Sequence, residues 1–238
     1  MISISLKNVS VDYPVFSRSK DVSFKNKIFN KLIGGIQFSN NSKQKYIKAL
    51  NNITITLNAG DRIGIMGANG SGKSTLLKIF AGSLVPTSGQ LLSYGTISSL
   101  IDFSMGLDGE LTAIENIILR AGLKNMTKQE ATRYVDDVIN FSDLEEFKNI
   151  QICQYSSGMR LRLAFSMATY NVADILIMDE IIFVGDKSFE KKVKSRLNEL
   201  IDQSKILIIA SHNHDLLKTY CNKFINLDKG SISSINFS

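Results

Sequence analysis

The sequence predicts one α/β domain built around a mostly parallel sheet. Three apolar runs indicate buried strands, because a parallel strand covered on both faces is hydrophobic along its length. They occupy residues 63–66, 174–180 and 205–212, and a glycine-rich loop and a helical pattern follow the first. A chain of 238 residues with 44% hydrophobic side chains can bury such a core as a single domain.

The glycine-rich loop is the most informative segment. It fits the pattern G-x-x-x-x-G-K-[ST], between an apolar strand and a helix over residues 75–82. Glycines let phosphate oxygens approach backbone N–H groups, and the helix N-terminus adds partial positive charge. Lys73 can reach the β- and γ-phosphates of a nucleotide, and the Ser74 hydroxyl can bind Mg²⁺. We therefore expect nucleotide contacts from Gly67, Asn69, Gly70, Ser71, Gly72, Lys73, Ser74 and Thr75.

The other two apolar runs end in side chains suited to phosphate chemistry. Asp179 and Glu180 end the second run, and His212 ends the third. A carboxylate beside a phosphate loop can hold Mg²⁺ through its water shell, and a second one can polarise an attacking water. We expect these roles for Asp179 and Glu180, with a helix N-cap as the structural alternative for paired acids. We expect His214 to be a solvated residue in the first turn of a helix.

A fourth element, Tyr155-Ser156-Ser157-Gly158-Met159, precedes another helical pattern. Gly158 lies 85 residues after Lys73 (158 − 73), and Asp179 lies 21 residues after Gly158 (179 − 158). His212 follows Asp179 by 33 residues (212 − 179). This order and spacing resembles the ATP-binding-cassette (ABC) ATPases over nearly the whole chain. The resemblance implies a RecA-like P-loop core with a parallel-rich sheet, an antiparallel β subdomain and an α-helical subdomain.

The resemblance also implies how the site works. ATP and Mg²⁺ are the expected cofactors, with Ser74 and Asp179 at the metal. The family's catalytic positions correspond to Lys73, Glu180 and His212, the last as a sensor of the γ-phosphate. Ser157 and Gly158 correspond to the signature that faces the γ-phosphate of a second copy. Two copies would therefore enclose two ATP molecules head to tail.

Two departures from the general family resemble the subgroup that exports bacterial polysaccharides. Tyr155, Ser157 and Met159 replace three residues of the usual L-S-G-G-Q signature. After Glu180, residues 184–189 read V-G-D-K-S-F, like the turn found in O-antigen and teichoic-acid exporters.

The stretch between the phosphate loop and the signature lacks the glutamine that in most cassettes contacts Mg²⁺ and the membrane partner. Asp102 is the nearest candidate for that role and for a metal ligand. A shift of the alignment by one residue would place Phe103 there instead, and a solvated surface carboxylate is the simpler alternative for Asp102. The surrounding residues, about 98–160, are expected to form the helical lobe, with Thr127 and Glu130 as a capping box.

An insertion over residues 14–48 separates two strands, over 1–13 and 51–57, of the antiparallel subdomain. Apolar spacing inside it predicts a helix over about 24–33, either near the membrane partner or packed on its own lobe. In the family an aromatic residue at the end of the first strand stacks on adenine. Tyr13 has that position, and Tyr46 competes for it.

Composition restricts the remaining possibilities. No apolar run is long enough to span a bilayer, and Cys153 and Cys221 lack metal-ligand spacing. A net charge of +6 is compatible with an anionic membrane surface or with simple solubility. The 26 residues after His212 (238 − 212) are expected to be too few for the C-terminal carbohydrate-binding domain of some O-antigen exporters. DNA-repair cassettes carry a long coiled coil and translation cassettes occur in pairs, so no nucleic-acid partner is expected.

We therefore expect one ABC domain over residues 1–238, a peripheral ATPase at the cytoplasmic face of a bacterial inner membrane. It would power export of a lipid-linked polysaccharide, O-antigen in the first place, through a separate membrane permease. A capsule or teichoic-acid exporter is the near alternative. An importer ATPase and a soluble ABC ATPase outside transport are the more distant ones.

Overall fold

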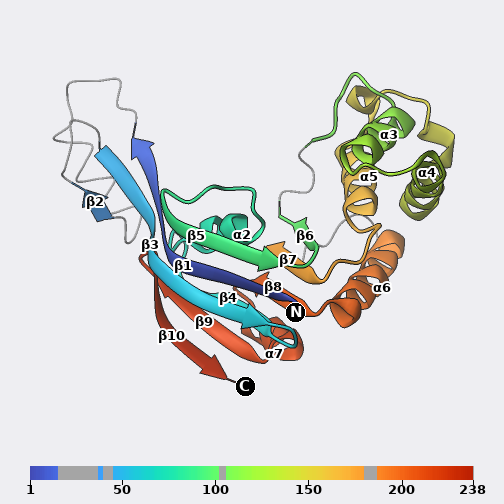
Figure 1. Ribbon diagram of the computed structural model, residues 1–238. Helices are drawn as coiled ribbons and strands as arrows, with labels where there is room; N and C mark the ends of the chain where they lie inside the picture. Colours follow the sequence, from blue (N-terminus) through green and yellow to red (C-terminus); the bar gives the residue numbers. More distant parts are fainter. Residues whose placement is uncertain (16–36, 40–44, 102–105, 180–186, 238) are drawn as a thin grey trace. The chain divides into compact units, whose positions relative to one another are not determined.

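The computed structural model describes residues 1–15, 37–39, 45–101, 106–179 and 187–237 (Figure 1). The chain forms two compact units. The first comprises Met1–Ile97, Asp174–Ile181 and Lys205–Ser238. The second comprises Ser98–Ala173 and Ile182–Ser204. The helical lobe expected over 98–160 therefore extends to residue 173 and also includes a later helix.

The first unit holds two sheets, except that residues 98–100 at the edge of the larger sheet belong to the second unit. The six-stranded sheet has the order β10-β9-β4-β8-β7-β6, and β4 pairs in parallel with both β8 and β9. Its strands are β4 (Arg62–Met66), β6 (Ile97–Leu100), β7 (Ile175–Asp179), β8 (Ile206–Ala210), β9 (Lys223–Asp228) and β10 (Ser231–Phe237). All five residues of β8 are buried, as are four of the five in β7, so the two apolar runs are the buried parallel strands that their composition predicted.

The four-stranded sheet is antiparallel, in the order β2-β3-β1-β5. Its strands are β1 (Ser3–Val15), β2 (Gln37–Ser39), β3 (Lys45–Asn58) and β5 (Ser88–Tyr94). Pairing between β1 and β3 continues as far as Val15 and Lys45, so β1 ends two residues later than expected and β3 begins six residues earlier. The extra residues of β3 include Lys45 and Lys48, which interrupt the apolar alternation from which a strand is recognised. The helix expected over 24–33 lies outside the described residues.

Two helices cover the parallel strands of the first unit. They are α2 (Lys73–Phe80) and α7 (His214–Tyr220). Leu76, Leu77, Ile79 and Phe80 of α2 are fully buried, and α2 packs against β7 and β8. α7 begins at His214 because the Asn213 side chain accepts hydrogen bonds from the N–H groups of Asp215 and Leu216.

The second unit is helical. It contains α3 (Ala113–Leu123), α4 (Lys128–Ser142), α5 (Ser157–Ala168) and α6 (Lys187–Gln203), with short 3₁₀ turns η1 (Glu145–Phe147) and η2 (Ile152–Gln154). The capping box of Thr127 with Glu130 is confirmed at the start of α4. Thr112 and Glu115 form a second capping box at the start of α3, and hydrogen bonds from Thr112 lower the pKa of Glu115. Both boxes satisfy N–H groups that lack partners in the first turn.

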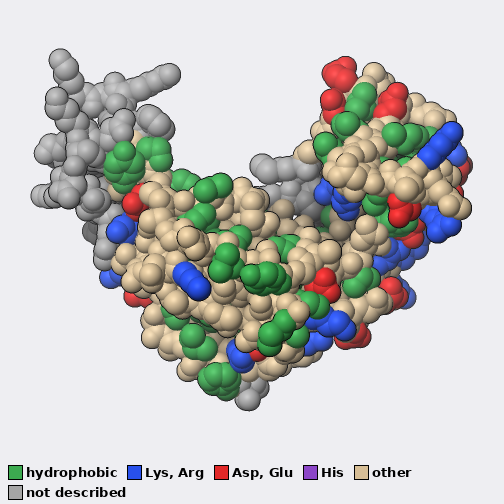
Figure 2. Space-filling view, in the orientation of Figure 1, with side chains coloured by type: hydrophobic (Ala, Val, Ile, Leu, Met, Phe, Trp, Pro, Cys, Tyr) green, Lys and Arg blue, Asp and Glu red, His purple; other side chains and the backbone are tan. Residues whose placement is uncertain are grey.

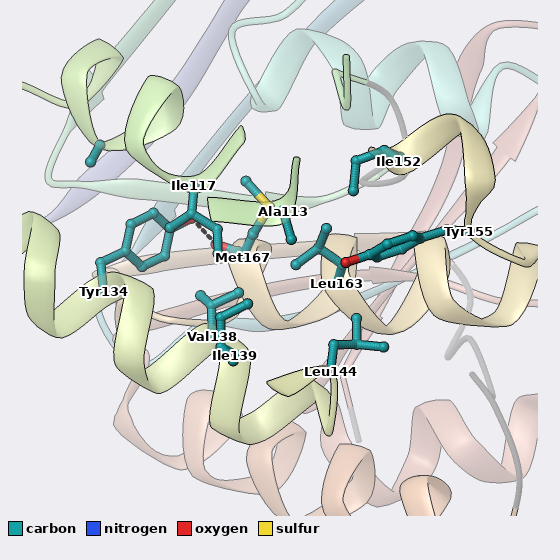
Figure 3. Close-up of a cluster of buried hydrophobic side chains, with 11 residues drawn as sticks. Ala113, Ile117, Tyr134, Val138, Ile139, Leu144, Ile152, Tyr155, Leu163 and Met167 are labelled. Carbon is teal, nitrogen blue, oxygen red and sulfur yellow. Dashed lines mark hydrogen bonds between the residues drawn. The ribbon is translucent and has the colours of Figure 1, made fainter. Parts of the chain in front are cut away.

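A buried cluster joins α3, α4 and α5 (Figure 3). Tyr134 of α4 is fully buried, and its hydroxyl donates to the carbonyl of Met167 in α5 at 2.9 Å. The hydrogen bond matters because a buried carbonyl without a donor is costly. Its neighbours in the cluster include Ala113, Ile117, Val138, Ile139, Leu144, Ile152, Tyr155 and Leu163.

An aromatic and arginine cluster attaches α6 to the same unit. Phe189 meets Phe141 edge to face, with ring centroids 5.7 Å apart. The Arg196 guanidinium lies 4.2 Å from the centre of the Phe141 ring and forms an ion pair with Asp137 at 3.4 Å. The guanidinium of Arg162 in α5 lies 5.0 Å from the centre of the Phe189 ring. A second cation–π contact thus links α5 to α6.

Tyr134 provides a test of this packing. Burial raises the pKa of Tyr134 to about 12, whereas an unfolded tyrosine titrates near about 10. The native state therefore keeps a proton that the unfolded chain loses. The stabilisation from this group is complete below about pH 10 and is lost as pH rises through the native pKa.

We expect Tyr134→Phe to lower the free energy of unfolding at neutral pH by about 1 kcal/mol, because the Met167 carbonyl loses its donor. Between about pH 10 and 12 its stability should fall less steeply than that of the parent protein. Urea unfolding across this range measures both effects. Tyr94→Phe, at an exposed position, is the control and should keep the parent slope. A parent-like slope for Tyr134→Phe would contradict the conclusion that the raised pKa of Tyr134 contributes to stability.

Candidate functional site

Three candidate segments of the first unit lie at the same edge of the six-stranded sheet. The phosphate loop follows β4, His212 follows β8, and Asp179 ends β7. These strands are parallel neighbours in the order β4-β8-β7, so their carboxyl ends lie together. The carboxyl edge of an open parallel sheet is where such folds bind ligands. The strand order thus brings together residues that are more than 100 positions apart in the sequence, as the spacing of the motifs predicted.

The phosphate loop has a backbone that only glycine can adopt at two points. Gly67 has φ of 151°, and a Cβ there would lie 2.4 Å from the Leu227 carbonyl oxygen. Gly72 has φ of 107°, and a Cβ there would lie 2.6 Å from the Ala49 carbonyl oxygen. Gly72 is also the N-cap of α2, and no side chain caps this helix. The start of α2, which carries partial positive charge, therefore lies in the phosphate loop.

The other loop residues are arranged around this turn. Asn69 and Gly70 are exposed, and Gly70 also has a positive φ of 78°. The Ser71 side chain points inward: the residue is 3% exposed, and its hydroxyl has no hydrogen-bond partner in the described part of the chain. Thr75 is half-buried in the first turn of α2. The Ser71 hydroxyl therefore lies away from the surface at which a phosphate would bind.

Lys73 bends back over its own loop. Its ammonium group donates to the carbonyl oxygens of Gly67 at 2.7 Å and Ala68 at 3.1 Å. These bonds hold the ammonium beside the exposed loop residues. Phosphate oxygens form stronger, charge-assisted bonds with an ammonium group than neutral carbonyls do, so Lys73 can exchange these partners for a bound phosphate.

Ser74 and Asp179 meet directly. The Ser74 hydroxyl donates to the Asp179 carboxylate at 3.0 Å. Neighbouring oxygen ligands of octahedral Mg²⁺ lie about 3 Å apart, since metal–oxygen distances are about 2.1 Å. The two oxygens are thus spaced to bind one Mg²⁺ ion or its water shell. Among the described residues, no group of three or more His, Cys, Asp or Glu side chains is placed to hold a metal ion.

His212 lies in a short turn that is anchored on both sides. The Ser211 N–H bonds to the carbonyl of Ile65 in β4, two residues before the phosphate loop, at 3.4 Å. The Ser211 hydroxyl accepts from the Asn213 N–H at 3.0 Å, and Asn213 caps α7. The imidazole between these anchors is exposed. His214 is also exposed, in the first turn of α7 as expected. Ser211 and Asn213 were not among the expected site residues, although an asparagine just before a helix is a recognisable cap signal.

Tyr13 lies near the end of β1, opposite Ile47 of β3. A register shift against β3 separates Tyr13 from the buried Val11, which pairs with Leu50. The Leu50 side chain approaches Gly72 of the phosphate loop. Tyr13 is 38% exposed, so its ring is accessible. Tyr46 pairs with Pro14, so its side chain belongs to the opposite face.

The signature residues open α5 in the second unit. Ser156 is the N-cap and accepts from the Met159 N–H at 3.2 Å, and the helix begins at Ser157. The Ser157 and Gly158 N–H groups belong to the first turn, which has no intrahelical acceptor for them. A Cβ on Gly158 would meet only the Ser156 hydroxyl, at 3.9 Å. Packing within the described part of the chain thus does not require glycine at this position.

Tyr155 explains one departure from the general signature. It is 2% exposed, and its hydroxyl donates to the Phe147 carbonyl at 2.7 Å. Burial raises its pKa. The Arg160 side chain donates to the Tyr155 carbonyl at 3.1 Å. Tyr155, in place of leucine, thus holds the signature against the core of the second unit through its buried ring and through the hydrogen bonds of its hydroxyl and its carbonyl.

The start of β7 is held by a separate pair of residues. The backbone N–H and the hydroxyl of Thr96 both donate to the Asp174 carboxylate at 2.9 Å, and these bonds lower the pKa of Asp174. The Lys205 N–H donates to the Asp174 carbonyl at 2.8 Å. These contacts fix β7 beside β8 and so support the position of Asp179. Glu180 and Asp102 lie outside the described residues.

The loop, the neighbouring carboxylate and the parallel sheet define a nucleotide-binding α/β protein of the P-loop class. A model of the ABC transporter family matches residues 50–182. The O-antigen export system ATP-binding protein RfbE of Yersinia enterocolitica is 34% identical over 232 residues, which cover 98% of this chain and 97% of that protein. The teichoic acids export ATP-binding protein TagH of Bacillus anthracis is 37% identical over 89% of this chain, which spans only 39% of that longer protein.

Among solved structures, a dimeric post-hydrolysis state of the ATP-binding cassette MJ0796 bound to ADP and Pi has the same fold. Its TM-score is 0.69 at 22% identity, over 98% of both chains. The chain belongs to the ABC transporter family and is one of its ATP-binding ATPase subunits. None of the helices in the described ranges is both long and apolar enough to cross a bilayer.

Gly67 and Ser71 of the phosphate loop give opposite expectations. Gly67→Ala should abolish ATP binding, because its Cβ would collide with the Leu227 backbone. Ser71→Ala should keep ATP binding and leave stability equal or higher by up to about 1 kcal/mol, because it removes an unpaired buried hydroxyl. Isothermal titration with ATP and urea unfolding measure the two effects. Gly122→Ala, which meets open space, is the matched glycine control. Wild-type ATP affinity in Gly67→Ala would disprove the close-approach argument.

Proposed function

We propose that this chain is the Mg²⁺-dependent ATPase subunit of an ABC exporter for a lipid-linked polysaccharide, most specifically O-antigen. The observation that carries this proposal is the 34% identity to an O-antigen export ATPase over nearly the whole length of both chains. The unusual signature Tyr155-Ser156-Ser157-Gly158-Met159 supports the same subgroup. The similarity to teichoic-acid export proteins keeps a teichoic-acid or capsule polymer as the alternative cargo.

The residues divide the work of hydrolysis in this proposal. The phosphate loop and Lys73 bind the phosphates, and Tyr13 stacks on the base. Ser74 and Asp179 hold Mg²⁺, for which their 3.0 Å contact is suitable. Glu180 polarises the attacking water, and His212 donates to the γ-phosphate. Bound ATP supplies the phosphoanhydride bond whose hydrolysis drives the cycle. Asp102 is proposed to replace the missing glutamine as a contact to Mg²⁺.

The proposed assembly is a head-to-tail dimer on a membrane permease. The N–H groups of Ser157 and Gly158 would bind the γ-phosphate held by the second copy, and the lack of packing around Gly158 is favourable for such an approach. ATP binding would close the dimer and hydrolysis would reopen it. The permease would carry the polymer, and the ATPase would sit peripherally at the cytoplasmic face of the inner membrane. The insertion over 14–48 would lie close to the permease.

Glu180→Gln tests the catalytic assignment. An amide cannot accept the water proton, so we expect the turnover rate to fall by about 10²–10⁴-fold while ATP affinity is retained. Because ATP then persists, the variant should form a stable dimer with ATP in size-exclusion chromatography. Glu190→Gln, an exposed acid in α6, is the control and should hydrolyse ATP at the parent rate. Parent-like turnover in Glu180→Gln would remove Glu180 from the catalytic role.

Deleting the gene in its native host tests the cargo. We expect loss of one surface polysaccharide and accumulation of its lipid-linked form inside the cell. Complementation with the wild-type gene should restore the surface polymer, and complementation with Glu180→Gln should not. The chemical identity of the accumulated glycan distinguishes O-antigen from teichoic acid or capsule. A normal set of surface glycans in the deletion strain would reject the export proposal.

A further inference from the structure

The outer face of the antiparallel sheet is a feature that ATP hydrolysis does not use. Ile4 and Leu6 of β1 are fully buried, so Ser3, Ser5 and Lys7 point to the opposite face. Lys7 pairs with Gln90 of β5, Ser5 with Leu92 and Ser3 with Tyr94. Paired residues of adjacent strands share a face, so these six side chains form one continuous surface.

A groove crosses this surface where the strands are irregular. It is open, has a volume of about 770 Å³, and is lined by Lys7, Asn8, Ser10, Asn52, Ser88, Gly89 and Gln90. Asn8, Asn52 and Gly89, one from each of three neighbouring strands, all have positive φ. The register of β1 shifts beside them against both β3 and β5. The three irregularities coincide and bend the sheet around the groove.

Internal hydrogen bonds hold the groove in shape. The Asn8 N–H donates to the Thr54 hydroxyl at 3.0 Å, and that hydroxyl donates to the Asn8 side-chain oxygen at 3.0 Å. The Asn52 N–H donates to the Ser10 hydroxyl at 3.0 Å. Within the described ranges, the side-chain amides of Asn52 and Gln90 bond to no protein group. The groove thus presents donors and acceptors that are positioned but not used.

Apolar surface continues from the groove along β5. Leu92 and Tyr94 lie two and four residues beyond Gln90 on the same face and are 38% and 63% exposed. Tyr94 is about 13 Å from Gln90, at about 3.3 Å per residue of strand. Figure 2 shows that the surface over β1, β3 and β5 is mostly uncharged, whereas charged side chains are frequent over the helices of the second unit.

We infer that this groove binds an uncharged polyhydroxylated ligand, a segment of a saccharide chain. Side-chain amides and hydroxyls both donate and accept, which suits adjacent hydroxyl groups of a sugar. The exposed tyrosine ring offers a flat apolar surface with a polar end. Lys7 is the one charged residue among the seven that line the groove, which makes a phosphate or other polyanion a poor match.

The groove and the nucleotide occupy opposite faces of the sheet. The buried Val11 pairs with Leu50 on the face that carries the phosphate loop, whereas Lys7 and Gln90 belong to the outer face. The nucleotide and the saccharide can therefore be bound at the same time. The inference goes beyond the proposed function, because export through a permease does not require the ATPase chain to touch the glycan.

The experiment uses the full chain and the surface polysaccharide of the native host, delipidated and cut to short fragments by mild acid. NMR follows the side-chain amide signals of Asn8, Asn52 and Gln90 during titration. We expect these signals to shift, and Gln90→Ala or Tyr94→Ser to weaken binding roughly tenfold each. Gln129→Ala, an exposed amide of α4, is the matched control and should bind like the parent. None of the three variants should change the ATPase rate.

The outcomes separate this inference from the proposed function. Unmoved amide signals, or parent-like binding by both Gln90→Ala and Tyr94→Ser, would overturn the saccharide groove whatever the deletion strain shows. Shifts with inorganic phosphate that equal those with the glycan would overturn the uncharged-ligand assignment. Shifts with a peptide of the permease but none with the glycan would also overturn the assignment of the groove to a saccharide. Specific glycan binding with normal surface glycans in the deletion strain would support the groove and reject export.

Discussion

The close approach of three backbone segments around the phosphate loop is the constraint on which the first unit depends. Gly67 lies against the Leu227 carbonyl of β9, and Gly72 lies against the Ala49 carbonyl of β3. The Gly230 N–H, in the turn after β9, donates to the Ser71 carbonyl at 2.9 Å, and the Gly230 carbonyl accepts from the Asn51 N–H at 2.8 Å. These contacts join the loop to both sheets, so glycine is required there for folding as well as for phosphate.

The same contacts explain how the nucleotide site is assembled. The turn at Gly230 ties the parallel sheet to β3, and β3 in turn fixes the register of β1 and hence the position of Tyr13. On the other side of β4, the Ser211 bond to Ile65 holds His212 next to the loop. Backbone hydrogen bonds thus position the phosphate loop and the His212 turn, and side-chain bonds of Lys73 and Ser74 complete the geometry.

The second unit supports the signature, which we propose acts on another copy. Its N-terminal N–H groups are left available, while Tyr155 below them is buried and hydrogen-bonded. Arg196 and Phe189 attach α6 to the same body through Phe141 and Asp137. Rigid support beneath an exposed helix start is the arrangement that a binding surface for a phosphate requires.

Motif spacing and apolar runs were sufficient to determine the α/β class, the parallel strands, the phosphate loop and the capping box of Thr127, because each of these is a local pattern with a local physical cause. The 3.0 Å contact of Ser74 with Asp179, the placement of Tyr13 and Tyr46 on opposite faces, and the true bounds of β1 and β3 were decided by strand order and register. The bent groove between Asn8, Asn52 and Gly89 was also invisible in the sequence. Its residues come from three separate strands, and only the pairing of those strands brings them together.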